Sequence, residues 1–400
     1  MAQENPSVTR FREYIRIKSV QPDPDYNSCI EWVKEQAKEI GLEFDLIHFE
    51  LQPGFAVVLT WKGSNPDLQA LMLNSHMDVV PVNPSKWSHD PFDAIKDDDG
   101  KIFGRGTQDM KSVGVQHMEA VRNLKAQGYS PQRTVHITFV PDEEIGGTNG
   151  MAKFVETTEF KKLNVGFELD EGGPCPTEQF GLFYGERALW QIKVTIKGNT
   201  GHALNFVEGT SVEKLQKLMN GFLTLREKEK EKLSDGDVSR LGLVTTINIT
   251  MINGGLQPNV IPPELTAVVD MRVTPNGWTE EKAEEIIEKI IEESGSDITY
   301  EFINRNPLIP ETPINDENPW WRCFKRTCDE LEMKLLPMIC PGATDARFLR
   351  SKGIPAFGFS PMNYTPMLLH DNDEYLEEKI FLKGIDIFTK LVRNLTEESL

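Results

Sequence analysis

The sequence predicts an α/β protein into which a second, α+β domain is inserted, and three observations predict this fold class. Helical and extended patterns alternate over residues 1–185, as they do in an α/β core. Over 186–305 the pattern changes to long strands of alternating apolar and polar residues, separated by two helices. The α/β pattern returns over 306–400. We therefore expect a discontinuous first domain, 1–185 with 306–400, and an inserted domain, 186–305.

The first domain is expected to consist of helices and strands that alternate along the chain. Apolar residues at helical spacing predict its helices, and the second helix is expected to end at Gly41. The expected helices span 7–17, 29–40, 109–126, 320–331, 345–351 and 376–395. The expected strands, which are apolar and rich in β-branched residues, span 55–61, 71–78, 134–140, 165–169 and 356–359.

The inserted domain is expected to have one wet face on its sheet, because its strands alternate between apolar and polar residues. The expected strands span 189–197, 243–252, 265–273 and 299–303, and the expected helices span 211–233 and 279–293. The resulting order, strand-helix-strand-strand-helix-strand, is that of a ferredoxin-like domain.

Composition and charge exclude several classes of protein. Lys and Arg number 43 and Asp and Glu 62, which gives a net charge of −19. A protein with this much negative charge repels nucleic acids and anionic membrane faces, and we therefore expect neither as a partner. The five cysteines form no C-x-x-C pair, which indicates free thiols in a reducing compartment, the cytoplasm. We expect no secretory signal peptide, and no apolar run approaches the roughly 20 residues that a membrane-spanning helix needs.

Polar residues that can bind metals stand where predicted core elements end. They occur in five segments: 74–78, 104–111, 140–147, 169–173 and 369–374. In open α/β sheets, ligands bind beyond the carboxyl ends of the strands. His76 and Asp78 are two residues apart on an extended segment and therefore point the same way. A carboxylate is the usual partner that fixes the tautomer of a metal-bound histidine.

Each segment taken alone also has a simpler interpretation. His76 and Asp78 can form a local hydrogen-bonded pair, Asp109 can cap the helix that follows it, and the acids of 142–144 can lie in a solvated loop. Together, two histidines and several acids at separate elements supply the mixed nitrogen and oxygen ligands of Zn²⁺, Mn²⁺ or Co²⁺. One carboxylate can bridge two such ions about 3.5–4 Å apart. The glycines of 104–106 lack the phosphate-loop spacings, so phosphate binding is not expected.

Three motifs in this order carry a resemblance to a known family. They are Ser75-His76-Met77-Asp78-Val79-Val80-Pro81, Gly104-Arg105-Gly106-Thr107-Gln108-Asp109-Met110-Lys111 and Pro141-Asp142-Glu143-Glu144-Ile145-Gly146-Gly147. Over essentially its whole length the chain resembles the co-catalytic dizinc peptidase and amidohydrolase family, and within it the aminoacylase branch. Residues 87–92 and 360–363 add to that similarity. The resemblance implies a catalytic domain with a mixed sheet flanked by helices, and an inserted domain for dimerisation or for covering the site.

The resemblance also implies a role for each residue of the site. His76 and Glu171 are expected to hold one zinc ion, Glu144 and His370 the other, and Asp109 to bridge them. Co²⁺ or Mn²⁺ is expected to be able to replace zinc. Asp78 is expected to orient His76, and Glu143 to act as general base. A cis peptide bond is expected between Asp109 and Met110.

The function that the resemblance implies is hydrolysis of N-acyl-L-amino acids to a carboxylate and a free L-amino acid. His202 is expected to stabilise the tetrahedral oxyanion, in dimeric members from the partner subunit, and Asn259 and Arg272 to bind the substrate. Apart from the resemblance, Arg347 can bind the substrate carboxylate by a bidentate contact. Without the resemblance, His202 reads as structural and Arg272 as the partner in a strand salt bridge. The other histidines are expected to be structural: His48, His89, His117 and His136.

Two other functions stay open at this stage. A dipeptidase or carboxypeptidase on the same scaffold would use the same metals and differ only in its substrate pocket. A non-catalytic binding protein could keep the fold, but it would have no need of Glu143 and the five ligand positions.

Overall fold

The computed structural model describes residues 4–49, 54–233 and 238–397, and it divides into two compact units. The first consists of Met1–Tyr184, Thr312–Pro337 and Thr344–Leu400. The second consists of Gly185–Glu311 and Met338–Ala343. Among the described residues, none of the helices combines the length and the apolar character that crossing a membrane requires.

The largest sheet has eight strands in the order β1-β2-β6-β3-β7-β16-β8-β15. They are β1 (Glu43–His48), β2 (Phe55–Trp61), β3 (Ala70–His76), β6 (Val135–Val140), β7 (Val165–Asp170), β8 (Phe180–Glu186), β15 (Leu335–Cys340) and β16 (Ala356–Gly358). β3 pairs in parallel with β6 and with β7, and β7 in parallel with β16, whereas β2 is antiparallel to β1 and β6. The sheet is therefore mixed, as expected, and its parallel centre brings four carboxyl ends to one edge.

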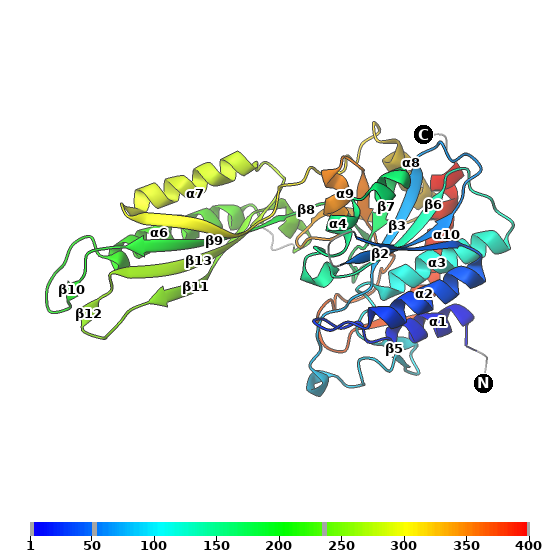
Figure 1. The fold of residues 1–400 in the computed structure, drawn as a ribbon, viewed down its shortest axis with the longest axis horizontal. Coiled ribbons are helices and arrows are strands. Elements are labelled where there is room, and N and C mark those ends of the chain that lie inside the picture. Colours follow the sequence, from blue (N-terminus) through cyan, green and yellow to red (C-terminus); the bar gives the residue numbers. More distant parts are fainter. Residues whose placement is uncertain (1–3, 50–53, 234–237, 398–400) are drawn as a thin grey trace. The chain divides into compact units, whose positions relative to one another are not determined.

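Helices cover both faces of this sheet (Figure 1). Neighbouring residues of β2 show why, because Val57 and Leu59 belong to one apolar cluster and Ala56 and Val58 to another. The first cluster includes α1 (Pro6–Ile15), α2 (Tyr26–Ile40), α3 (Lys111–Ala126), α8 (Pro319–Glu330) and α10 (Glu378–Glu397). The second includes α4 (Met151–Phe154), α5 (Thr158–Lys162) and α9 (Ala346–Ser351). Gly41 ends α2 in the left-handed conformation, at φ 75°, as predicted.

A small sheet joins two distant parts of the first unit. Its strands are β4 (Ile95–Lys96), β5 (Lys101–Phe103) and β17 (Tyr375–Glu377), in the order β17-β5-β4. Tyr375 pairs with Phe103, so the segment that leads to Asp109 lies beside the segment that follows His370. Strands of two or three residues give no periodic pattern, and for that reason the sequence did not reveal them. The short 3₁₀ turns are η1 (Pro84–Lys86), η2 (Glu143–Ile145) and η3 (Val238–Leu243).

The second unit has a four-stranded antiparallel sheet in the order β11-β13-β9-β14. Its elements are β9 (Ala188–Lys197), α6 (Ser211–Glu231), β11 (Thr246–Gly254), β13 (Glu264–Val273), α7 (Glu280–Ser294) and β14 (Ile298–Arg305). The even-numbered residues of β9, from Ala188 to Ile196, are buried and pack against α6 and α7. The order of elements is the ferredoxin-like one that the sequence predicts. A separate pair, β10 (Gly201–His202) and β12 (Val260–Ile261), completes the unit.

Candidate metal centre

The parallel strands at the centre of the large sheet position four of the predicted site residues. His76 is the last residue of β3, which lies between β6 and β7. Glu171 follows β7 directly, and Glu143 and Glu144 begin the turn η2 after β6. His76 stands in register with Val140, the last residue of β6. The side chains at these strand ends therefore meet at one edge of the sheet.

Two further site residues arrive on loops. Asp109 precedes α3, whose N-cap is Met110 without a side-chain hydrogen bond, so the alternative that Asp109 caps this helix is wrong. The Asp109–Met110 peptide is cis, as the resemblance implies. His370 stands between β16 and β17 with a positive φ of 60°, a region that few residues other than glycine adopt.

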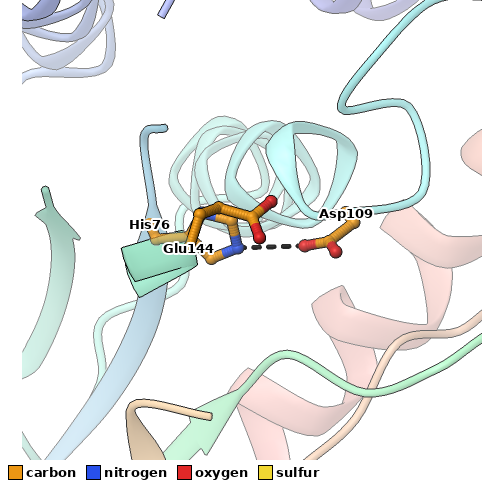
Figure 2. A group of neighbouring side chains, drawn as sticks. All are labelled: His76, Asp109 and Glu144. Atoms are coloured by element: carbon orange, nitrogen blue, oxygen red, sulfur yellow. Dashed lines mark hydrogen bonds and ion pairs between the residues drawn. The ribbon is translucent and has the colours of Figure 1, made fainter. Parts of the chain in front are cut away.

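Asp109 lies between the two histidines and presents a different oxygen to each. Its Oδ1 is 3.0 Å from Nε2 of His76, and its Oδ2 is 3.2 Å from Nε2 of His370. His76 Nε2 also lies 3.5 Å from Glu171 Oε2, and His370 Nε2 lies 3.0 Å from Glu144 Oε2. Figure 2 shows Asp109 facing His76, with Glu144 beside them. Donor atoms of His76, Asp109 and Glu144 all lie within 4.8 Å of one another, and so do those of His76, Glu143 and Glu171.

Asp78 connects the histidine of β3 to the turn after β6. Its backbone carbonyl oxygen accepts a hydrogen bond from Nδ1 of His76 at 2.9 Å, which leaves Nε2 free to face the cluster. Its carboxylate accepts the backbone N–H groups of Glu143 and Glu144, both at 3.2 Å. Gln21 donates to the same carboxylate at 2.8 Å. One buried residue therefore orients His76 and fixes the backbone of the turn.

Asp142, the first of the three successive acids, shares Gln21 with Asp78, because Gln21 Nε2 donates to the carboxylates of both, at 3.2 Å and 2.8 Å. It has a positive φ of 65°. Its carboxylate accepts hydrogen bonds from the Tyr26 hydroxyl at 2.7 Å and from Asn149 Nδ2 at 3.1 Å. Three successive acids thus separate into two that join the cluster and one that anchors the turn to α2.

In the cluster, buried carboxylates lie against two histidines, and these neighbours shift one another's pKa. Burial, and next the charge of Glu171, raise the pKa of Glu143 well above its usual range. Burial lowers the pKa of His76, but Glu171 and then Asp109 raise it more, so that it ends well above its usual range. Hydrogen bonds to Asp109 and Glu144 raise the pKa of His370 to about 10. Positive charge is therefore favoured at both histidines.

The residues present fit a pair of divalent cations. Each oxygen of Asp109 faces a separate histidine nitrogen, which is the arrangement a bridging carboxylate needs. Oε1 of Glu144 is buried and has no hydrogen-bond partner in the part of the chain that the structure describes. Metal ions bind the deprotonated forms of such ligands, so cations would supply the positive charge that balances these carboxylates.

The four predicted substrate-side residues lie in both units. In the first unit, Arg347 donates to the backbone carbonyl of Gly146, two residues after Glu144, at 3.0 Å. In the second unit, His202 on β10 and Asn259 lie close together, because the Ala203 N–H donates to the Asn259 carbonyl at 2.9 Å. Arg272 forms the strand salt bridge that the sequence left open.

That salt bridge joins Arg272 Nε to Asp270 Oδ1 at 2.9 Å, two residues apart on β13.

Sequence reasoning did not single out Gln21, Gln108 or Glu374, which support the cluster through hydrogen bonds. Glu374 was visible only as a glutamate in the acidic turn after His370. Gln108 stands in the motif 104–111 but was given no role of its own, and nothing in the pattern marked Gln21.

The chain belongs to peptidase family M20/M25/M40, whose family model matches residues 72–394. The predicted family and fold class are therefore confirmed. The chain is 48% identical over 394 residues to Aminoacylase-1A of Rattus norvegicus, covering 98% of this chain and 96% of that protein. It is 48% identical over 392 residues to Aminoacylase-1 of Homo sapiens (98% and 95% covered), and 43% identical over 405 residues to Aminoacylase-1 of Dictyostelium discoideum (98% of each).

Solved structures of the family share the fold. An M20 family metallo-carboxypeptidase from Sulfolobus solfataricus superposes with a TM-score of 0.73 at 17% identity, covering 98% of this chain and 100% of that one. A dinuclear metal-binding peptidase of the M20 family from Bacillus subtilis superposes with a TM-score of 0.69 at 15% identity, covering 98% and 99%.

Proposed function

We propose that this protein is a zinc-dependent amidohydrolase that converts N-acyl-L-amino acids to a carboxylate and a free L-amino acid. The observation that carries the proposal is the geometry of Asp109, whose two oxygens face His76 and His370, with Glu143 beside them. The choice of substrate is supported by 48% identity to proteins named aminoacylase-1 over 98% of the chain.

The proposed centre holds two zinc ions per subunit. His76 and Glu171 would bind one ion, Glu144 and His370 the other, and Asp109 both. The set of two imidazoles and three carboxylates suits zinc, and Co²⁺ or Mn²⁺ would be accepted by the same ligands. The name of the Bacillus subtilis relative, which describes a dinuclear peptidase, agrees with two ions.

The proposed chemistry is amide hydrolysis with Glu143 as the proton carrier. Bound divalent ions would lower the pKa of water toward about 7 and would polarise the substrate carbonyl. Glu143 takes a proton from the attacking water while the water oxygen bonds to the carbonyl carbon. It then gives this proton to the amide nitrogen as the C–N bond breaks.

Four residues are proposed to contact the substrate. Arg347 is proposed to bind the substrate carboxylate, since its guanidinium lies beside Gly146, near Glu144. Asn259 and Arg272 are proposed as polar substrate contacts, and His202 as the group that stabilises the oxyanion.

We also propose that the protein is a homodimer that assembles through the second unit, in the cytoplasm. Leu204, Phe206 and Leu256 are large apolar side chains that stand exposed near His202 and Asn259. β11, an edge strand of the four-stranded sheet, exposes Met251 and Ile252 as well. The five cysteines are buried free thiols, as in a reducing compartment.

The substrate proposal is tested by parallel assays on zinc-loaded protein. N-acetyl-L-methionine is expected to be cleaved with a kcat/KM at least about tenfold above that of any dipeptide in a matched panel. A preference for dipeptides would favour a peptidase instead. If no zinc binds and no amide is cleaved after zinc is added, a binding protein that keeps the fold is the better description.

The proposed role of His202 is tested by subunit mixing. His202→Ala is expected to lower kcat more than it raises KM, because the oxyanion forms only during reaction. If the partner subunit supplies His202, mixing inactive His202→Ala and Glu143→Ala dimers is expected to restore part of the activity. Sedimentation and mass analysis establish that the dimers exist and exchange subunits. No recovery despite exchange would contradict a shared site.

A further inference from the structure

A buried carboxylate, that of Glu374, lies between the loop that carries Asp109 and the turn that carries His370. Its side chain is fully buried. Its Oε1 accepts the backbone N–H groups of Gln108 at 2.6 Å and of Asp109 itself at 3.3 Å. Its Oε2 accepts the backbone N–H of Gly106 at 3.1 Å. Three backbone donors of the bridging residue's own loop therefore converge on one carboxylate.

Arg105 supplies the positive charge that lets this carboxylate remain buried. Its Nη1 donates to Glu374 Oε2 at 2.7 Å, and the arginine is only 3% exposed. Its guanidinium lies over the ring of Trp87, with the central carbon 5.3 Å from the ring centroid. The positive φ of Gly106, 92°, belongs to the same tight loop. In other proteins such converging N–H groups bind phosphate, but here an internal carboxylate occupies them.

The side chain of Gln108 makes a second connection between the same two segments. Its Nε2 donates to the carbonyl oxygens of Pro366 at 3.1 Å and Tyr375 at 2.8 Å, and its Oε1 accepts the N–H of Leu368 at 3.0 Å. These three backbone groups lie on both sides of His370 in the chain. The Gln108 side chain therefore binds backbone groups of the turn 366–375, while the Glu374 side chain accepts backbone N–H groups of the loop 104–109.

From this double connection we propose that Glu374 is a positioning residue for the cation held by His370 and Glu144. It fixes the loop 104–109 against the turn 366–375, and so sets the 3.2 Å separation between Asp109 Oδ2 and His370 Nε2. The inference rests on the proposed metal centre. It assigns a role to a carboxylate that binds no metal and touches no substrate.

The effect is confined to one of the two ions because the other half of the centre has its own support. His76 is fixed by β3 and by the Asp78 carbonyl, and Glu171 follows β7. Neither residue hydrogen-bonds to Glu374 in the described part of the chain. Loss of the Glu374 contacts is therefore expected to displace His370 and one oxygen of Asp109, and to leave the ion at His76 in place.

The experiment compares Glu374→Gln with the wild-type protein. The amide keeps the size of the side chain but turns an N–H₂ group toward N–H donors and leaves Arg105 without its counter-charge. The affinity for the zinc ion held by His370 and Glu144 is expected to fall 10- to 100-fold, the range for residues that support metal ligands. The affinity for the ion held by His76 and Glu171 is expected to fall by less than about threefold. Equilibrium dialysis of metal-free protein against zinc measures both constants. The absorption spectrum of the cobalt-loaded protein reports on the coordination of each ion.

Glu377→Gln is the matched control, because the Glu377 carboxylate pairs with Lys379 at the surface of the same segment. Both zinc constants are expected to stay within about twofold of wild type in this variant. Gln108→Met removes the second connection without changing charge, and it is expected to weaken the same ion. Glu374→Asp keeps the charge and is expected to recover part of the affinity. Circular dichroism of each metal-free variant reports whether it folds.

The outcomes separate this inference from the proposed function. If wild type binds two ions and both Glu374→Gln and Gln108→Met bind them unchanged, the positioning role is overturned and the metal centre stands. If folded variants lose both ions equally, the role is overturned as well, because the effect is not confined to the His370 ion. If wild type binds no divalent ion, the proposed function and the positioning role fail together. If Glu374→Gln does not fold, Gln108→Met decides alone.

Discussion

The two halves of the candidate metal centre share Asp109 but differ in how they are held. The His76 side chain is 1% exposed, ends a central strand and is fixed through Asp78, whereas the His370 side chain is 55% exposed and stands in a turn. Each histidine faces one oxygen of the same carboxylate. The difference teaches that the sheet pre-organises one half of the centre, while the other depends on contacts between loops. We expect the ion at the His370 half to bind more weakly and to exchange first.

The largest expected effect concerns Glu143, which belongs to the buried half. Glu143→Gln removes the proton carrier but none of the proposed ligands, so kcat is expected to fall at least about 10³-fold while two ions stay bound. Steady-state kinetics and metal analysis of the same sample measure both. A kcat within tenfold of wild type would refute the role as general base.

The next effect separates the two halves directly. His76→Ala and His370→Ala are each expected to weaken one zinc ion by more than about 100-fold, since each removes a ligand rather than its support. His76→Ala is expected to destabilise the metal-free protein more, by about 3 kcal/mol, because it leaves buried carboxylates without their partner. His370 is half exposed, so its loss is expected to cost less than about 1 kcal/mol.

Zinc dialysis and urea unfolding of the two metal-free variants provide the measurements. Equal destabilisation by both substitutions, or loss of both ions in each variant, would contradict the comparison between the halves.

The smallest expected effect concerns His117, a buried histidine outside the metal centre whose pKa is shifted by burial and not by a neighbouring carboxylate. His117 packs edge-on against Phe388, with ring centroids 4.5 Å apart, and burial lowers its pKa to about 3. Between pH 6.5 and 3 the unfolded chain binds a proton that the folded protein excludes. The free energy of unfolding should therefore fall as the pH falls through this window, by about 1.4 kcal/mol per unit.

His117→Phe keeps the aromatic contact and removes this titration. From pH 7.5 to 5.0 the metal-free wild type is expected to lose about 2 kcal/mol more stability than the variant. Urea unfolding at the two pH values measures the difference, and parallel pH profiles would show that His117 does not titrate in this way. His76 cannot behave like this, because its carboxylate neighbours raise its pKa well above its usual range.

Much of the fold could be predicted from local pattern. The strand at 55–61 has the bounds that its β-rich composition indicated, and the ferredoxin-like order followed from alternating runs. The helix expected at 109–126 begins at Lys111 instead, since Asp109 turns toward the two histidines rather than toward the helix. Capping and metal binding use the same carboxylate, and local sequence cannot choose between them. β5 and β17 were missed because pairing across more than 270 positions, not local propensity, defines them.

The sequence by itself determined which residue types stand at the ends of core strands, the alternation of elements, and a family resemblance that the comparisons confirm. Only the tertiary structure decided which acids meet the histidines, that Asp142 turns to Tyr26, and that Glu374 fills a cradle of backbone N–H groups. The physical reason is the range of the forces. Periodicity and propensity act over a few residues, whereas a buried charge is stabilised by whatever donors the fold brings to it, here 265 to 269 positions away.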